Sequence, residues 1–255
     1  MESNSLLKLI YSSVQRKQWL KELIKPIYLK LNGELKKGFL RRFFHWLTAG
    51  HIVRFLKIRK ILNTNHSYQC LQVGGGYHTI PQWINGDLLA GDIYLDASKK
   101  LPFPDNSIDF IFSEQFFEHL SYKDGQFFLR EAYRVLKPGG VIRQATPSLN
   151  GIVDIYQDRN PVVRQEEVVR RHQKHNQDCK NACHFINDLF RLWGHQFIYD
   201  QETFLKSHQQ VGFIDAQIQS FGESSHQPLQ QRERHADVDW MKSAFVLIGE
   251  ARKPA

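Results

Sequence analysis

A short apolar segment that runs straight into three glycines constrains the fold of this chain more than any other feature of its sequence. Residues 68–73 have the composition of a buried β-strand, and Gly74, Gly75 and Gly76 follow at once. Glycine lets a backbone turn sharply and approach a ligand that a Cβ atom would exclude. We therefore predict a strand whose carboxyl end turns around a ligand.

Short strands alternate with helices after this turn. Helices are expected at 123–136 and 202–211, and the first of them is expected to stop at residues 137–140, Lys-Pro-Gly-Gly. Further strands are predicted by the apolar runs at 84–88, 93–95, 108–112, 141–145, 214–220 and 244–251. This order predicts an α/β fold of the Rossmann-like, doubly wound class, with a mostly parallel sheet of seven strands.

The N-terminal quarter differs from the rest of the chain in charge. Residues 1–66 carry 14 Lys and Arg against 3 Asp and Glu, whereas the whole chain has 34 against 26 and a formal net charge of +8. Apolar residues at helical spacing predict helices over 5–31, over 34–48 and from Gly50 onward. We therefore divide the chain into a basic helical N-terminal extension, 1–66, and a second domain, 67–255.

The basic extension has three interpretations. In the first interpretation, which we favour, the helices pack on their own domain. In the second, residues 34–60 lie on a membrane surface. In the third, the positive charge attracts the phosphates of a nucleic acid. The apolar runs are shorter than the roughly 18 residues of a membrane-spanning helix. The first residues lack the basic region of a signal peptide, and the three cysteines form no disulfide framework. We expect a cytoplasmic protein. If residues 34–60 lie on a membrane surface, the protein is peripheral to that membrane.

Six motifs follow one another between residues 70 and 145. The first two are the glycine turn and Asp87, a carboxylate at the tip of the next strand that can accept both hydroxyl hydrogens of a ribose. The other four are Asp96-Ala97 before Leu101-Pro102-Phe103, the segment 105–109, Glu118-His119-Leu120, and the stretch 136–140. In this order the chain resembles the class I S-adenosylmethionine-dependent methyltransferases, above all their small-molecule, type 11 group.

The resemblance implies the cofactor, the reaction and the roles of individual residues. The cofactor is S-adenosylmethionine, and the expected reaction is methylation, on oxygen, of a small molecule, sugar or glycan. Gly74, Gly75 and Gly76 pass under the methionine and ribose parts of the cofactor, and Asp87 holds the ribose. The resemblance also implies that Asp96 accepts a hydrogen bond from the adenine amine and that Ala97 lies beside the adenine ring. Ser113 and Glu114 border the methionine end of the cofactor and the acceptor.

Two departures from the family pattern affect the cofactor site. An acidic residue is common where Gln72 stands, so the contact with the methionine amine is altered. The link from Gly76 to Trp83 is too short for a parallel crossover with its usual helix, so a turn is expected there. Asp109 is expected to support the structure and not to contact the cofactor.

A hydroxyl acceptor benefits from a general base, and histidine is the usual one. His195, His226 and His235 are the candidates. We favour His195, because it lies between aromatic residues at the end of the polar segment 148–200, which we predict to be a substrate lid. A packing role for His195 is the alternative.

Five residues of this segment belong to types that bind zinc: His172, His175, Cys179, Cys183 and His184. Zinc sites usually take close pairs of ligands from two separate segments, and that pattern is missing here. We therefore expect a polar helical lid and no metal.

Three rival functions stay open at this stage. An RNA methyltransferase would use the basic extension, although Ser113-Glu114-Gln115-Phe116 differs from the Asn/Asp-Pro-Pro-aromatic motif of enzymes that methylate base amines. An NAD-binding oxidoreductase is disfavoured, because the glycine turn lacks the third glycine of the dinucleotide fingerprint. A non-catalytic protein that binds S-adenosylmethionine stays open because of Gln72. The oligomeric state is not predicted.

Overall fold

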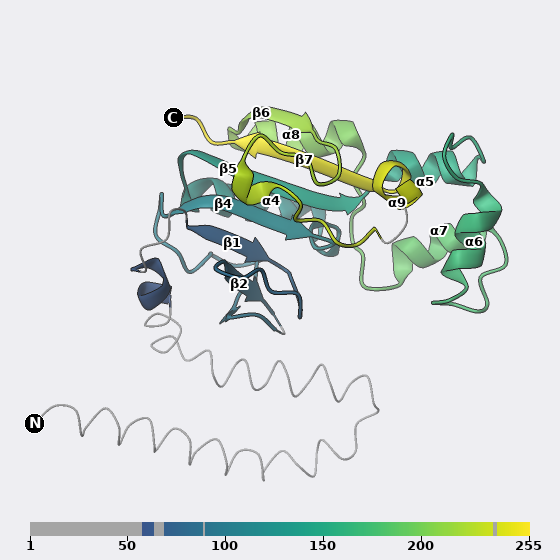
Figure 1. The fold of residues 1–255 in the computed structure, drawn as a ribbon, viewed down its shortest axis with the longest axis horizontal. Coiled ribbons are helices and arrows are strands. Elements are labelled where there is room, and N and C mark those ends of the chain that lie inside the picture. The colour runs from purple at the N-terminus through teal and green to yellow at the C-terminus, as the bar shows by residue number, and fades with distance from the viewer. Residues whose placement is uncertain (1–57, 64–68, 89, 237–238) are drawn as a thin grey trace, which may run out of the picture. The chain divides into compact units, whose positions relative to one another are not determined.

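The computed structural model of the chain describes residues 58–63, 69–88, 90–236 and 239–255. These residues form a seven-stranded sheet with helices packed against it, which confirms the predicted Rossmann-like α/β class (Figure 1). Residues 58–62 are helical. The rest of the basic extension 1–66, with its predicted helices and its boundary at residue 66, lies outside the described residues.

The sheet has the spatial order β3-β2-β1-β4-β5-β7-β6. Strands β1 to β5 pair in parallel, whereas β7 runs antiparallel to both β5 and β6. The chain starts in the middle of the sheet and crosses over after β3, which creates a switch point between β1 and β4, where open α/β sheets bind ligands. The strands are β1 (Cys70–Val73), β2 (Ile84–Asp87), β3 (Ile93–Tyr94), β4 (Ile108–Glu114), β5 (Leu136–Pro147), β6 (Ile214–Ile218) and β7 (Val246–Arg252).

The central strands are buried on both faces, as expected of parallel strands with covered faces. On one face Leu71 lies opposite Ile111, which lies opposite Ile142, and all three belong to the larger apolar core. On the other face Phe110 and Phe112 belong to a smaller core. The period of two along each strand thus divides the apolar residues between two layers.

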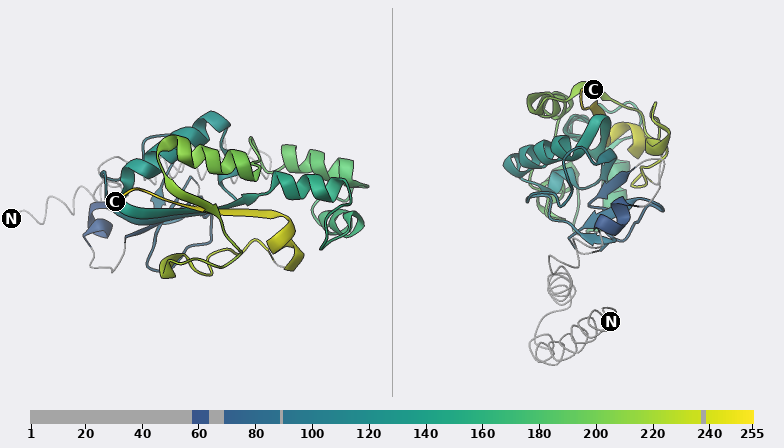
Figure 2. Two further views of the ribbon diagram at one scale, coloured as in Figure 1. Left: turned by 90° about the horizontal axis from the view of Figure 1, so that it is seen from above. Right: turned by 90° about the vertical axis from the view of Figure 1, so that its left-hand side faces the viewer.

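The larger core is covered by helices α4 (Tyr122–Val135) and α8 (Gln201–Val211), which lie on the same side of the sheet (Figure 2). Ser121 begins α4 by accepting a hydrogen bond from the Asp124 N–H with its hydroxyl, and Asp200 begins α8 through the Thr203 N–H in the same way. Helix α8 ends at Gly212, whose φ of 110° needs a residue without a Cβ.

Helix α4 ends earlier than the sequence predicted. Its last residue is Val135, and Leu136 already has extended dihedral angles and opens β5. Proline disfavours the helical conformation of the residue before it, here Lys137, which explains why the chain leaves the helix ahead of the two glycines.

The opposite face is covered by irregular segments. Residues 77–83 and the short η2 turn (Gln227–Leu229) place Ile80, Trp83 and Leu229 in the smaller core. No helix lies between β1 and β2, which confirms the turn predicted from the short link. The Asn85 side chain holds that link by accepting from the Ile80 N–H at 2.8 Å and donating to the Trp83 carbonyl at 3.0 Å.

Helices α5 (Leu149–Tyr156), α6 (Gln165–His172) and α7 (Ala182–Arg191) make up most of the predicted lid segment 148–200. They share a separate apolar core and lie beyond the carboxyl ends of β4 and β5 (Figure 1). Helix α9 (Asp239–Ala244) contributes Ala244 and Trp240 to that core. In the described ranges no helix combines the length and the apolar character that crossing a bilayer requires.

Candidate functional site

The glycine turn after β1 has the backbone conformation that glycine permits. Gly74 and Gly76 have φ values of 73° and 56°. A Cβ atom on Gly74 would lie 2.2 Å from Phe116 Cδ2, so this position also needs the space. A Cβ atom on Gly76 would meet nothing within 4 Å, which means that the backbone of Gly76 opens onto empty space. The turn therefore leaves room for a ligand beside Gly76.

Asp87, the last residue of β2, lies against this turn. Its Oδ2 accepts a hydrogen bond from the Gly76 N–H at 2.9 Å, and its Oδ1 accepts from the Ala90 N–H at 3.1 Å. The carboxylate thus fixes the position of the glycine turn relative to the end of β2. A ribose role for Asp87 stays a prediction that this position supports.

Asp96 and Ala97 follow the neighbouring strand β3, whose Tyr94 lies opposite Asp87. Oδ1 of Asp96 accepts from both the N–H and the hydroxyl of Ser98, so this carboxylate shapes a turn, and the Ala97 side chain packs in the larger core. Both residues lie at the same carboxyl edge as the glycine turn, and their predicted contacts with adenine stay predictions.

A cavity of about 250 Å³ lies over the glycine turn, and Gln72, Gly74, Gly75 and Gly76 line it. Gln72 is only 5% exposed, and its Oε1 has no hydrogen-bond partner among the described residues. A buried acceptor without a donor costs stability unless a ligand or water supplies one. This oxygen therefore offers a place for a ligand donor such as an ammonium group.

Glu114 and His235 form the opposite side of this cavity. Oε1 of Glu114 accepts from the backbone N–H groups of Arg234 and His235, at 2.6 and 2.9 Å, and Oε2 lies 3.0 Å from Nδ1 of His235. Burial acts to raise the pKa of Glu114, but the hydrogen bonds from His235 and Arg234 outweigh it and lower that pKa. The same bond raises the pKa of His235 against the opposing effect of burial.

The segment that carries His235 is fastened to the sheet by Arg143 of β5. Nη2 and Nη1 of Arg143 donate to the carbonyls of Ser220 and Glu223, at 3.1 and 2.7 Å. The same guanidinium pairs with the carboxylates of Glu233 and Glu250. We call residues 220–236 the strap. Its position over the glycine turn is set by this buried cation.

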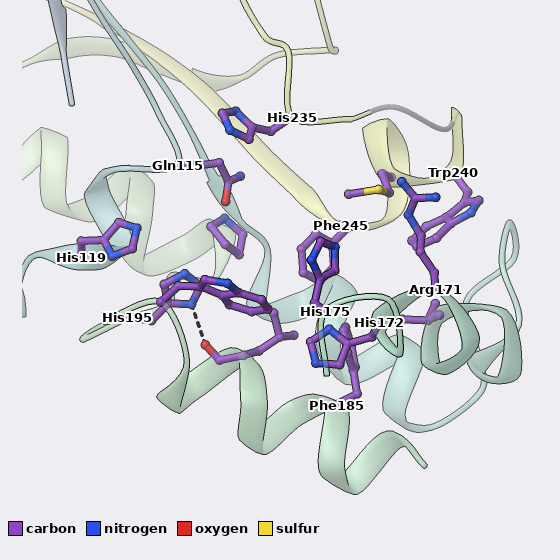
Figure 3. A pocket seen from close by; sticks show the side chains of 15 residues that line it. Gln115, His119, Arg171, His172, His175, Phe185, His195, His235, Trp240 and Phe245 are labelled. Carbon is purple, nitrogen blue, oxygen red and sulfur yellow. Dashed lines mark hydrogen bonds between the residues drawn. The ribbon is translucent and has the colours of Figure 1, made fainter. Parts of the chain in front are cut away.

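A second and larger cavity, of about 410 Å³, lies between the strand ends and helices α6, α7 and α9 (Figure 3). Phe185, Trp193 and Trp240 give it apolar walls, and Arg171, His172 and His175 line its lid side. Gln115 and His235 line this cavity and the smaller one, so they mark the place where the two meet. Gln115 has a φ of 48°, a strained value for a residue with a side chain, as is common at functional sites.

His195 lines the larger cavity beside His119 (Figure 3). The centroids of the two rings lie 4.9 Å apart. Nδ1 of His195 lies 2.5 Å from the Leu189 carbonyl, which it can reach only as a donor. Burial lowers the pKa of both His195 and His119, so both rings are neutral near pH 7. The general-base role predicted for His195 stays a prediction.

The remaining candidates lie away from the cavities. Ser113 is buried inside the sheet and accepts a bond from Gln144, and it is not among the residues that line either cavity. The His226 ring lies against Phe110, in the smaller core. Asp109 binds the Gln69 N–H and Lys137, which confirms the structural role expected of it.

The sequence reasoning missed Gln115 and the strap, and it ranked His235 below His195. Gln115 follows a motif residue, Glu114, and this adjacency was the available signal. His235 is 121 positions beyond Glu114, and their contact leaves no local pattern.

Residues 82–143 match a family model described as a methyltransferase domain. The strand order with its reversed last pair, the glycine turn and the two strand-end carboxylates agree with that match. The match covers about a quarter of the chain and assigns this segment to a methyltransferase domain.

Solved structures similar to this chain have low identity to it. A SAM-dependent methyltransferase from Archaeoglobus fulgidus is 15% identical over 80% of this chain and 94% of its own, with a TM-score of 0.44. A SAM-dependent methyltransferase from Thermotoga maritima is 15% identical over 86% of this chain and 98% of its own, with a TM-score of 0.43. A third structure is phosphoethanolamine N-methyltransferase 2 from Haemonchus contortus, in complex with phosphomonomethylethanolamine and S-adenosylhomocysteine. It is 13% identical over 87% of this chain and 58% of its own, with a TM-score of 0.42. No curated protein matches the chain.

Proposed function

We propose that this chain is a class I S-adenosylmethionine-dependent methyltransferase of the type 11 group. It transfers a methyl group to a hydroxyl oxygen of a small-molecule, sugar or glycan acceptor bound in the 410 Å³ cavity. The observation that carries the proposal is the pair of adjoining cavities, which share Gln115 and His235. A methyl donor in the smaller cavity and an acceptor in the larger one would meet beside these two residues. The larger cavity falls within the usual size range of small-ligand sites.

The smaller cavity has the features that S-adenosylmethionine needs. Gly76 leaves open space for the nucleoside, and Asp87 stands beside it. The unpartnered Oε1 of Gln72 can accept from the methionine ammonium, in place of the acidic residue that is common at this position. When bound, the cofactor supplies an electrophilic methyl group on a sulfonium, so the protein mainly has to orient the acceptor and remove its proton.

His235 is a candidate general base alongside the predicted His195. Its Nδ1 faces Glu114, which orients the ring and leaves Nε2 to take a proton from an acceptor hydroxyl. The groups that act on its charge are Glu114 and Glu118, which favour the protonated ring, and Arg234, which opposes it. His235 lines both cavities, whereas His195 lines only the larger one.

The lid side of the larger cavity favours an acceptor with an anionic group. Arg171 and His175 line it, and such side chains bind phosphate or carboxylate oxygens. RNA is less favoured, because residues 67–255 carry 20 Lys and Arg against 23 Asp and Glu. The cytoplasmic location and the membrane contact of residues 34–60 stay predictions, as does the closing of 148–200 as a lid.

Calorimetric titration with S-adenosylhomocysteine tests the cofactor site. We expect Asp87→Asn, which keeps the shape of the side chain, to weaken binding at least about tenfold, or about 1.4 kcal/mol. The control is Asp92→Asn, which removes a nearby carboxylate that binds Asn85. Equal affinities of wild type and Asp87→Asn would remove Asp87 from the site.

A panel of acceptors tests the reaction itself. The panel contains neutral sugars, sugar phosphates, carboxylated sugars and short RNAs, with S-adenosylmethionine labelled at the methyl group. Label on a sugar oxygen supports the proposal, and label on RNA alone overturns it. Cofactor binding without transfer to any acceptor supports the non-catalytic alternative.

A further inference from the structure

Three potential metal ligands meet beside the larger cavity, which two of them, His119 and His195, line. Glu118 and His119 lie in the short η1 turn (Phe117–His119) after β4, and His195 comes from the loop after α7. One carboxylate oxygen of Glu118 and one ring nitrogen of each histidine lie within 4.8 Å of one another. Ligands about 2.0–2.2 Å from a zinc ion lie roughly 3.4 Å apart, so small side-chain rotations bring this trio to bonding distance.

Two of these side chains, Glu118 and His195, are each oriented by a second partner. Nδ1 of His195 donates to the Leu189 carbonyl, which leaves the lone pair on Nε2. The His119 ring packs edge-on against the His195 ring, with centroids 4.9 Å apart. Oε2 of Glu118 accepts from the Thr146 hydroxyl at 3.0 Å. Protein metal sites have this arrangement, because the second partner fixes the ligand that faces the metal.

The second oxygen of Glu118 is the observation that points to a ligand. Glu118 is 0% exposed, and within the described part of the chain its Oε1 has no hydrogen-bond partner. An unpaired buried carboxylate oxygen is costly, and such groups are usually paired or bound to a metal. Nε2 of His195 is an acceptor because Nδ1 donates to the Leu189 carbonyl, so His195 does not satisfy this oxygen.

We propose that Glu118, His119 and His195 bind one divalent first-row metal ion, with zinc as the probe that fits the donor set. Two imidazoles and one carboxylate suit zinc and its neighbours, whereas magnesium and calcium prefer oxygen ligands alone. His119 and His195 line the acceptor cavity, so the remaining coordination positions face the acceptor. The metal is absent from the sequence prediction because Glu118-His119 and His195 are 76 positions apart.

The catalytic role of the metal rests on the proposed function and extends it. Binding of the metal does not depend on that function. An acceptor hydroxyl on the metal has a lowered pKa. Its proton would leave to solvent through the cavity, and its oxygen would bond to the methyl carbon. The carbon–sulfur bond of the cofactor would break, with its electron pair going to sulfur, so that S-adenosylhomocysteine is the leaving group. His195 would then act as a ligand and not as the base.

A second cluster, His172, Cys179 and Asp188, does not carry the same inference. Its three ligand atoms also lie within 4.8 Å of one another. Here, however, Nε2 of His172 pairs directly with Oδ2 of Asp188 at 2.7 Å, and Asn176 donates to the same oxygen at 2.8 Å. The donors satisfy one another and stabilise the lid helices. This cluster provides the rival site for the experiment.

The test is titration of metal-free full-length protein with Zn²⁺, followed by calorimetry, with Co²⁺ as an optical probe. We expect one zinc ion per chain, bound at least about 100-fold more weakly by His195→Ala and by Glu118→Gln. We expect an unchanged affinity for His184→Ala, which removes an exposed histidine of α7, and for His172→Asn, which alters the rival cluster. The visible absorption of bound Co²⁺ should disappear in His195→Ala.

Three results would overturn the metal site: no zinc binding by the wild type, full affinity in both ligand variants, or a loss confined to His172→Asn. His195→Ala keeps the test valid if Glu118→Gln does not fold, because His195 is only half-buried. S-adenosylhomocysteine is titrated into the same samples. If the metal-free wild type binds the cofactor and transfers methyl groups, the catalytic role of the metal is overturned and the proposed function stands. If the wild type does not bind S-adenosylhomocysteine, the proposed function is overturned.

Discussion

Nε of Arg143 and Oε1 of Glu233 lie 2.5 Å apart, and both side chains are 0% exposed. Oε2 of the same Glu233 accepts from the Gly222 N–H at 2.9 Å, so this carboxylate joins both ends of the strap to β5. A charge buried this deeply requires its partner, because water cannot replace it. The position of His235, two residues after Glu233, therefore depends on an ion pair inside the protein.

Glu233→Ala should lower the free energy of unfolding by about 3 kcal/mol, since it leaves Arg143 with one carboxylate in place of two. It should also weaken S-adenosylhomocysteine binding, because the strap forms one wall of the cofactor cavity. Urea denaturation and calorimetry measure the two effects. The control is Glu202→Ala, which breaks the exposed pair with Lys206 on α8 and should cost much less stability. Equal losses in the two variants would contradict the fastening role of Glu233.

Gly76→Ala and Gly139→Ala form a matched pair for the glycine turn. Both positions have positive φ, 56° and 78°, and in neither would a Cβ atom meet another atom within 4 Å. Each substitution should therefore cost a similar strain of about 1 kcal/mol. Only Gly76→Ala should weaken S-adenosylhomocysteine binding, because its methyl group enters the cofactor cavity. An unchanged affinity in Gly76→Ala would place the cofactor elsewhere.

The fold was predictable because its signals are local. The strands at 84–88, 108–112 and 141–145 are short apolar runs, and each one appears in the sheet within a few residues of its predicted bounds. The turn between β1 and β2 was also predictable, since ten residues cannot contain a parallel crossover with a helix. The glycine turn at Gly74–Gly76 was predictable from the same local order, whereas its role in binding the cofactor stays a prediction.

The acceptor side was less predictable because its contacts join distant segments. Glu114 binds the backbone at 234 and 235, and Arg143 binds Glu233 across 90 positions. In the sequence Arg143 is a single charged residue in a strand, and nothing indicates which carboxylate it meets. The choice of His195 over His235 as base depended on nearby aromatic residues, which contain no information on the strap.

His235→Gln should reduce kcat by about 10²- to 10⁴-fold if Nε2 of His235 removes the acceptor proton. Glutamine retains a hydrogen-bonding side chain but cannot act as a base near neutral pH. The Kd for S-adenosylhomocysteine should change much less, which calorimetry checks. His226→Gln is the matched control, because His226 lies in the same strap but against Phe110. A wild-type kcat in His235→Gln would remove His235 from proton transfer and leave His195 or the proposed metal site.

His208 should make the stability of the protein depend on pH. It is buried in α8, where Nδ1 binds the Phe204 carbonyl at 2.8 Å and Nε2 faces the Gln144 side chain at 2.7 Å. Burial lowers the pKa of His208 from its ordinary value of 6.5 to about 4, so the unfolded chain takes up a proton before the folded one does. This contribution to stability is complete above pH 6.5, falls as the pH decreases, and levels off near pH 4.

The total loss from this one group is on the order of 3 kcal/mol, at about 1.4 kcal/mol for each pKa unit. Urea denaturation between pH 7.5 and pH 4.5 measures it, with His208→Gln as the variant that lacks the group. We expect the free energy of unfolding of His208→Gln to fall less steeply with decreasing pH than that of the wild type. His184→Gln, which changes an exposed histidine, should keep the wild-type slope. Parallel slopes for wild type and His208→Gln would mean that His208 takes up its proton in the folded protein at its ordinary pKa.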